Sequence, residues 1–127
     1  MEDLKTKLYV NKDQGLKTLV KVYYAGHGAM RNMTYCVTTD PKKQYYPLEN
    51  MLMKLSQTEN SFVFGIFDCC RDPIKEEQKQ ATRGGGGESK LGEEELDQRE
   101  TNCMFMYRVY PNKTAAVSSV FSQALFQ

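Results

Sequence analysis

The stretch SFVFGIFDCCRDP, residues 61–73, decides how the chain is organised. Residues 61–67 form a nearly continuous apolar run, which is typical of a parallel strand buried on both faces. The run ends on two adjacent thiols, Cys69 and Cys70, with Asp68 before them and Arg71 after them. Open parallel sheets collect their functional groups at the carboxyl ends of strands. The stretch therefore predicts a buried strand with chemistry at its end.

The segments before this strand predict further elements of an α/β sheet. LKTLVKVYYA, 16–25, is rich in β-branched and aromatic residues and predicts a strand, and MTYCVTT, 33–39, predicts a shorter one. PLENMLMKLS, 47–56, begins with proline and has apolar residues at helical spacing, as does EDLKTKLY, 2–9. Strand, helix and strand in this order indicate a right-handed crossover and a parallel sheet.

The composition changes after residue 74. Residues 75–102 are charged and Gly-rich, and such a segment buries too little apolar surface to order itself, so we expect a long exposed loop. The glycine run at 84–87 predicts a linker, because no Gly-Lys-Ser/Thr of a phosphate-binding loop follows it. We expect one domain, with a core at 1–74 and a strand and a helix within 103–127.

The overall composition excludes several classes of protein. The 127 residues include 17 basic and 16 acidic side chains, a balance that favours neither nucleic acid nor an anionic membrane surface. No apolar run is long enough for a membrane-spanning helix and no signal peptide opens the chain, so we expect a cytoplasmic protein. The four cysteines lack the paired spacing of a zinc site, and we expect reduced thiols without a bound metal.

Two motifs at strand ends predict nucleophilic chemistry. The only histidine, His27, follows the strand at 16–25, and Cys70 follows the strand at 61–68. Because one crossover joins these strands, we expect the imidazole to lie near the thiol. An imidazole can take the proton of a thiol with an ordinary pKa of about 8.5 and return it to a leaving amine. Backbone N–H groups of Gly28 and Cys70 are candidates for holding an oxyanion.

YYAGHG, followed by FDCCRD with Cys70 43 residues after His27, resembles the caspase-like cysteine peptidases: caspases, metacaspases and paracaspases. The resemblance implies a three-layer α/β fold with a mainly parallel sheet. In the family's Asp-x-Cys pattern the second cysteine is the nucleophile, which implies Cys70 with His27 as its base. Asp68, two residues earlier, then lines the primary pocket and implies protein or peptide substrates cleaved after Arg or Lys. Asp72-Pro73 departs from the glycine that usually follows.

The resemblance has further implications outside the two motifs. The loop between the large and small catalytic parts is often cut in this family, so Arg83 and Lys90 are candidate processing sites. Calcium enters only by analogy with metacaspases, and no EF-hand spacing is present. The family usually has elements before and after those found here, so we expect a partial domain. An open sheet edge favours self-association.

Each of these interpretations has a simpler alternative. His27 can be an ordinary turn histidine, and Cys70 can be a buried structural thiol like the other three cysteines, Cys36, Cys69 and Cys103. Asp68 can cap its strand or pair with Arg71. The whole chain can be a catalytically inactive caspase-like scaffold or regulator that binds protein partners, because a fold does not dictate a function. A Cys-x5-Arg phosphatase is excluded, since no arginine lies six residues after Cys69 or Cys70.

Overall fold

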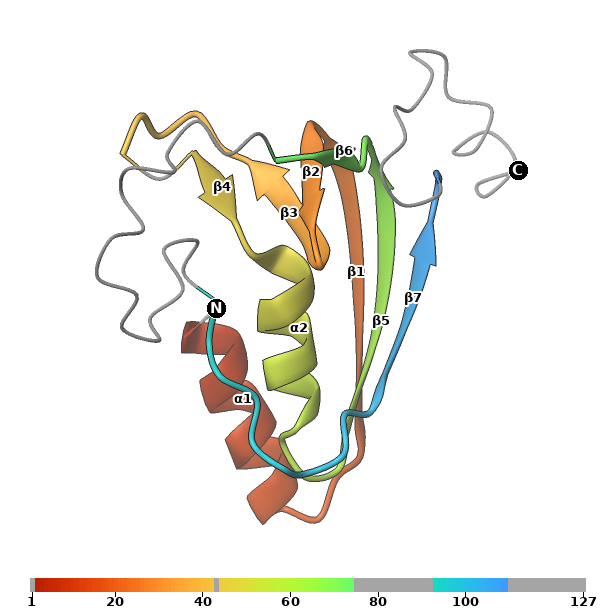
Figure 1. Ribbon diagram of the computed structural model, residues 1–127. Helices are drawn as coiled ribbons and strands as arrows, with labels where there is room; N and C mark the ends of the chain where they lie inside the picture. The colour runs from red at the N-terminus through yellow and green to blue at the C-terminus, as the bar shows by residue number, and fades with distance from the viewer. Residues whose placement is uncertain (1, 43, 75–92, 110–127) are drawn as a thin grey trace.

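A three-stranded parallel sheet organises the chain (Figure 1). The computed structural model describes residues 2–42, 44–74 and 93–109. In this sheet β1 (Thr18–Gly26), β5 (Ser61–Cys69) and β7 (Cys103–Tyr107) lie in the order β1-β5-β7, with β5 in the centre. Both pairings are parallel. The prediction of an α/β fold with a mainly parallel sheet is confirmed.

A second sheet has more strands but fewer residues than the first, and this small sheet lies at the carboxyl end of the parallel strands (Figure 1). Its strands are β2 (Gly28–Arg31), β3 (Met33–Val37), β4 (Tyr45–Tyr46) and β6 (Asp72–Pro73), in the order β4-β3-β2-β6. The sequence predicted only β3 among these, because the others are too short to show a two-residue repeat. Since β2 follows His27 and β6 follows Arg71, this sheet continues directly from both candidate motifs.

The two described helices cover the same face of the parallel sheet (Figure 1). In α2 (Leu48–Ser56) the side chains of Leu48, Leu52 and Leu55 are buried, as their helical spacing predicts. The helix α1 (Glu2–Asp13) adds Leu8, which is also buried.

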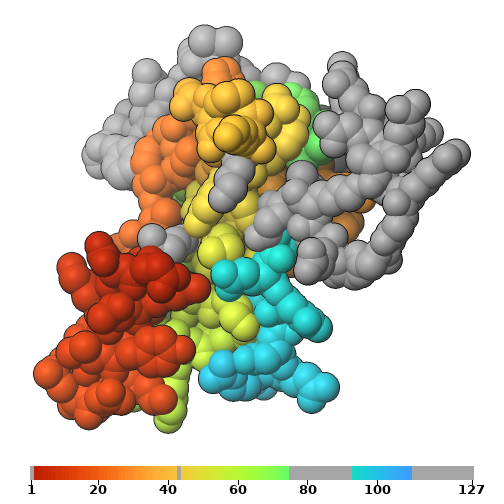
Figure 2. All heavy atoms as spheres, turned by 90° about the vertical axis from the view of Figure 1, so that its left-hand side faces the viewer, coloured from red at the N-terminus to blue at the C-terminus, as the bar shows by residue number. Residues whose placement is uncertain are grey.

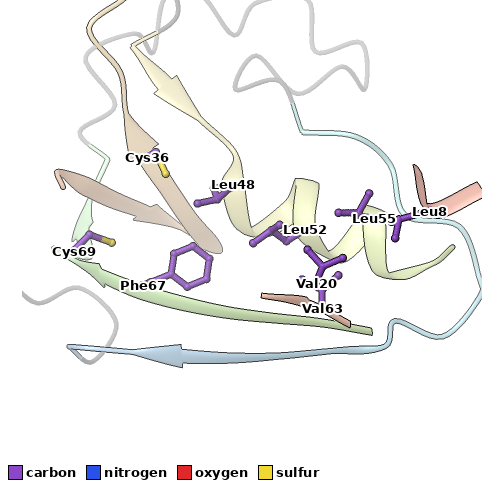
Figure 3. Packing of buried hydrophobic residues seen from close by; sticks show 9 residues of the cluster. All are labelled: Leu8, Val20, Cys36, Leu48, Leu52, Leu55, Val63, Phe67 and Cys69. Atoms are coloured by element: carbon purple, nitrogen blue, oxygen red, sulfur yellow. The ribbon is translucent and has the colours of Figure 1, made fainter. Parts of the chain in front are cut away.

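Apolar side chains from this face and from the small sheet form one core cluster. Figure 3 shows it between α2 and the strands, with Leu8 at one end and Cys69 at the other. Its buried members are Leu8, Val20, Cys36, Leu48, Leu52, Leu55, Val63, Phe67 and Cys69. At about 1.5–3 kcal/mol for each large apolar side chain that is fully buried, this cluster is the main source of stability in the described part.

The opposite face of the parallel sheet is apolar but more open. Residues of β5 alternate between the two faces, so Val63 and Phe67 are buried while Phe62 is 40% exposed. The expectation that this strand is buried on both faces is therefore wrong for the described structure, whose helices cover one face. The exposed Leu19, Met104 and Met106 of the neighbouring strands share the open face.

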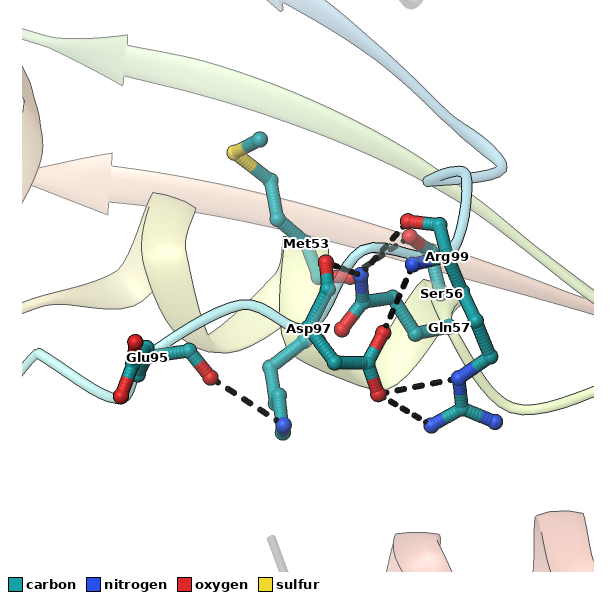
Figure 4. Close-up of polar contacts among 7 residues, drawn as sticks. Met53, Ser56, Gln57, Glu95, Asp97 and Arg99 are labelled. Atoms are coloured by element: carbon teal, nitrogen blue, oxygen red, sulfur yellow. Dashed lines mark hydrogen bonds and ion pairs between the residues drawn. The ribbon is translucent and has the colours of Figure 1, made fainter.

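Residues 93–102 contain no helix or strand but lie along α2. In Figure 2 this segment and α1 flank α2 on the helical face. Asn50 accepts a hydrogen bond from the Glu94 backbone N–H and donates one to its carbonyl oxygen, at 2.8 and 3.0 Å. The Gln57 side-chain amide donates to the carbonyl oxygens of Asp97 and Arg99 (Figure 4). These bonds hold residues 93–102 against α2, just before β7 begins.

Several expectations fall on residues that the structure does not describe. The glycine run, the candidate processing sites Arg83 and Lys90, and the expected helix after β7 all lie outside the described ranges. Among the described residues, none of the helices has the length and apolar character needed to cross a bilayer.

Candidate active site

The parallel pairing of β1 with β5 places the two motifs side by side. The register pairs Ala25 with Asp68 and Gly26 with Cys69, the last residues of the two strands. His27 and Cys70 are the next residue on each strand. Adjacent parallel strands lie about 4.8 Å apart, so the two motifs leave the sheet at the same point of its carboxyl edge.

Gly28 brings the histidine turn into direct contact with the cysteine pair. A Cβ atom built on Gly28 would lie 2.4 Å from the carbonyl oxygen of Cys70 and 2.6 Å from the Sγ of Cys69. Both separations are too short for any side chain, so this position requires glycine. The sequence identified Gly28 as a candidate oxyanion donor but did not predict this steric requirement.

The direction of the Gly28 N–H follows from its neighbours. The backbone N–H of Val37 donates to the His27 carbonyl oxygen at 2.9 Å, and the N–H of Ile74 donates to the Met30 carbonyl oxygen at 3.0 Å. Hydrogen-bonding groups alternate between the two sides of a strand. The N–H of Gly28 therefore lies on the side of β2 that faces β6 and Cys70, away from β3.

The backbone of His27 is fixed while its imidazole is exposed. Its carbonyl oxygen accepts hydrogen bonds from the Tyr24 hydroxyl at 2.6 Å and from the Val37 N–H. Burial, and next to it the neighbouring Cys36, raises the pKa of the Tyr24 phenol, so this hydroxyl stays protonated well into the alkaline range. This role of Tyr24 was not predicted from the sequence. The backbone of the turn is thus held by two hydrogen bonds, while His27 itself is exposed.

The two adjacent thiols have different surroundings. Cys69 is 2% exposed and belongs to the core cluster, and burial raises its pKa to about 12. Cys36 is also buried, and burial raises its pKa to about 11. Cys70 is half-buried. A thiol must be accessible and ionisable to act as a nucleophile, so Cys70 fits that role better than Cys69 or Cys36.

Asp68 lies at the end of β5 with both carboxylate oxygens occupied. Its Oδ2 accepts a hydrogen bond from the Tyr23 hydroxyl at 2.7 Å, and its Oδ1 is 2.9 Å from Nη1 of Arg108. The alternative pairing with Arg71 is wrong, because Arg71 points to other residues. Neither Tyr23 nor Arg108 was among the residues that the sequence singled out. Arg108 comes directly after β7, and the β5–β7 register that brings it beside Asp68 cannot be read from either strand alone.

Arg71 is buried and anchors the chain just after Cys70. Its Nε donates to the Thr34 hydroxyl at 3.2 Å, its Nη1 donates to the Val109 carbonyl oxygen at 3.3 Å, and its guanidinium lies 3.9 Å over the Tyr107 ring. Glu49 of α2 completes the cluster by accepting hydrogen bonds from the Thr34 N–H and the Tyr107 hydroxyl. The position of Cys70 is thus set by contacts to the helix and to both sheets.

Within the described ranges, no three His, Cys, Asp or Glu side chains converge in a way that suits a metal ion. These described residues therefore do not fit the calcium that the metacaspase analogy suggests.

One of three comparisons with known proteins identifies the family of the chain. No curated protein and no solved structure gives a match to the chain. The family model described as the caspase domain, of peptidase family C14, matches residues 1–127, the whole length of the sequence. With its histidine and cysteine motifs at the adjoining ends of two parallel strands, the chain belongs to the caspase-domain family of cysteine peptidases.

Proposed function

We propose that the protein is a cysteine endopeptidase in which Cys70 is the nucleophile and His27 the general base and acid. The observation that supports this most directly is the β1–β5 register, which leaves these two residues next to one another beyond the last paired residues. The burial of Cys69 and the partial exposure of Cys70 favour the later thiol.

The proposed reaction has two halves. In the first, His27 takes the Cys70 proton, and the sulfur attacks the carbonyl carbon of the scissile peptide. The N–H groups of Gly28 and Cys70 hold the resulting oxyanion. The C–N bond then breaks, His27 returns the proton to the leaving amine, and a thioester remains. In the second half, His27 takes a proton from water, the hydroxide attacks the thioester, and Cys70 leaves and is reprotonated.

The proposed specificity is for Arg or Lys on the amino side of the scissile bond. The side chain of Asp68 lies on the same face of β5 as those of Phe62, Phe64 and Ile66, opposite to the face of Cys69. It is 6% exposed. A carboxylate with so little water around it binds a guanidinium or ammonium group more strongly than a solvated one does. Segments of this chain with basic residues, at Arg83 and Lys90, are then candidates for self-cleavage.

A fluorogenic peptidyl-arginine substrate, with and without calcium, tests the proposal. We expect turnover that falls to background in Cys70→Ala and by about 10²–10⁴-fold in His27→Ala. The matched control is Cys69→Ala, which removes the neighbouring thiol and should keep turnover. Mass spectrometry of the termini should show cuts after Arg83 or Lys90 that are absent in Cys70→Ala.

Two results contradict the proposal. Turnover that persists in Cys70→Ala excludes this thiol as the nucleophile. No turnover, together with no labelling of Cys70 by a thiol-directed peptidyl inhibitor, favours a non-catalytic scaffold.

A further inference from the structure

The carboxylate of Asp68 already has a cationic partner within the chain. Nη1 of Arg108 lies 2.9 Å from Oδ1 of Asp68. The side chain of Arg108 is 13% exposed and that of Asp68 is 6% exposed. The Tyr23 hydroxyl donates to the other oxygen at 2.7 Å. An ion pair with this little solvent differs from an exposed surface pair, whose contribution is usually small.

The sheet register fixes this ion pair. Phe67 of β5 pairs with Tyr107 of β7, and the backbone N–H of Arg108 donates to the Phe67 carbonyl oxygen at 3.0 Å. Arg108 therefore follows β7 at the level where Asp68 follows Phe67 on β5. Tyr23, paired with Ile66, lies on the same face of the sheet as Asp68. The guanidinium is thus held beside the carboxylate by two adjacent backbones.

We propose that Arg108 is an internal competitor for the substrate's basic side chain and so determines the specificity of the pocket at Asp68. This inference rests on the proposed function, in which Asp68 binds an arginine or lysine of the substrate. An incoming cation must displace Arg108 from Oδ1 of Asp68. The apparent affinity for basic substrates is therefore the intrinsic affinity multiplied by the fraction of molecules in which the Asp68–Arg108 pair is open. Tyr23 keeps Asp68 oriented when Arg108 leaves.

The size of the effect follows from the kind of contact. A hydrogen bond between charged groups in a site with little solvent is strong enough to change a binding constant about 10- to 100-fold. Removing the guanidinium in Arg108→Gln should therefore lower KM for a peptidyl-arginine substrate by about that factor. A peptide with citrulline in place of arginine, which has no charge, should show no such gain.

The same position can be tested without peptidase activity. Benzamidine, a small cationic amidine, should bind the vacated carboxylate in Arg108→Gln and raise its thermal unfolding midpoint by about 4 °C at ten times the dissociation constant. Wild type, whose affinity is expected to be about 10- to 100-fold lower, should shift by about 1 °C or less at that concentration. The double variant Asp68→Asn/Arg108→Gln should not respond. The matched control is Arg99→Gln, because Arg99 pairs with the exposed Asp97 and lies outside the proposed site.

Arg108→Gln leaves a buried carboxylate with one partner fewer and can be unstable. If it folds only in the presence of benzamidine, that rescue supports the proposal, and failure of the rescue overturns it. Arg108→Lys keeps the positive charge but loses the planar fork, and its response should lie between those of wild type and Arg108→Gln.

The outcomes separate this inference from the proposed function. A benzamidine response in Arg108→Gln without peptide turnover supports the competitor role and rejects the peptidase. Turnover that depends on Cys70, with equal benzamidine response and equal KM in wild type and Arg108→Gln, rejects the competitor role and keeps the peptidase. A response that survives in the double variant also overturns the proposal, since Asp68 is then not the binding group.

Discussion

Replacing Gly28 with alanine tests the contact that joins the two motifs. The added Cβ would lie 2.4 Å from the Cys70 carbonyl oxygen and 2.6 Å from the Cys69 Sγ. An ordinary contact begins near 3.4 Å, so one backbone must move by about 1 Å relative to the other. The closer of the two partners is a backbone atom, which cannot rotate away as a flexible side chain can.

The size of two effects follows from this displacement. Overpacking of this kind costs about 1–3 kcal/mol in the free energy of unfolding. A misplacement of about 1 Å between a nucleophile and its base lowers turnover by about 10²-fold. We therefore expect Gly28→Ala to be measurably less stable in urea denaturation, and its kcat/KM for a peptidyl-arginine substrate to fall by about 10²-fold when corrected for the folded fraction.

Gly15→Ala serves as the control for stability alone. Gly15 has a positive φ of 71°, and a Cβ there would meet nothing within 4 Å. Alanine at this position costs about 1–2 kcal/mol through backbone strain without touching either motif. Loss of activity in Gly15→Ala equal to that in Gly28→Ala would show that the effect comes from stability. Full activity in a folded Gly28→Ala protein would refute the close contact itself.

Three further predictions concern the core and its titrating groups. The free energy of unfolding should fall between pH 9 and 10, because Cys36 and Cys69 ionise near pH 9.0 in the unfolded chain but only near pH 11 and 12 in the folded protein. Each thiol should contribute about 1 kcal/mol to this fall, and the Cys69→Ala variant should lack one of the two contributions. A free energy of unfolding that does not change over this pH range would contradict the burial of the two thiols. Leu52→Ala should lower the free energy of unfolding, measured by urea denaturation, by about 2–5 kcal/mol because Leu52 is buried. The control Leu16→Ala, at an exposed position, should change it by no more than about 0.5 kcal/mol. Equal decreases in the two variants would contradict the packing of Leu52. Glu49→Gln should lower the free energy of unfolding by about 1–3 kcal/mol, because the single amide oxygen cannot replace both carboxylate oxygens as acceptors for the Thr34 N–H and the Tyr107 hydroxyl. An unchanged thermal midpoint would exclude those bonds.

The sequence predicted the elements whose patterns are long and regular. The strands β1 and β5 and the helix α2 were found because β-branched runs and helical spacing of leucines extend over nine residues each. The order strand, helix, strand then predicted neighbouring parallel strands. The motifs at their ends were predicted to lie close together for the same reason, and the register agrees.

The contacts between distant residues were not predictable from those patterns. Asp68 and Arg108 are 40 residues apart in the sequence, and their pairing depends on the register between β5 and β7, which neither strand specifies alone. The small sheet was mostly missed because its strands are short and Asn32, with a positive φ of 63°, forms a turn between two of them. The buried contacts of Arg71 likewise involve two distant parts of the chain, Thr34 and residues 107–109.

The most direct test of the account maps which of the four thiols reacts with a peptidyl-arginine chloromethyl ketone. We expect a single adduct, on Cys70, that forms much more slowly in His27→Ala and still forms in Cys69→Ala. An adduct on Cys69 or Cys36, or a Cys70 adduct whose rate is unchanged in His27→Ala, would contradict the claim that this imidazole and this thiol act together at the end of the β1–β5 pair.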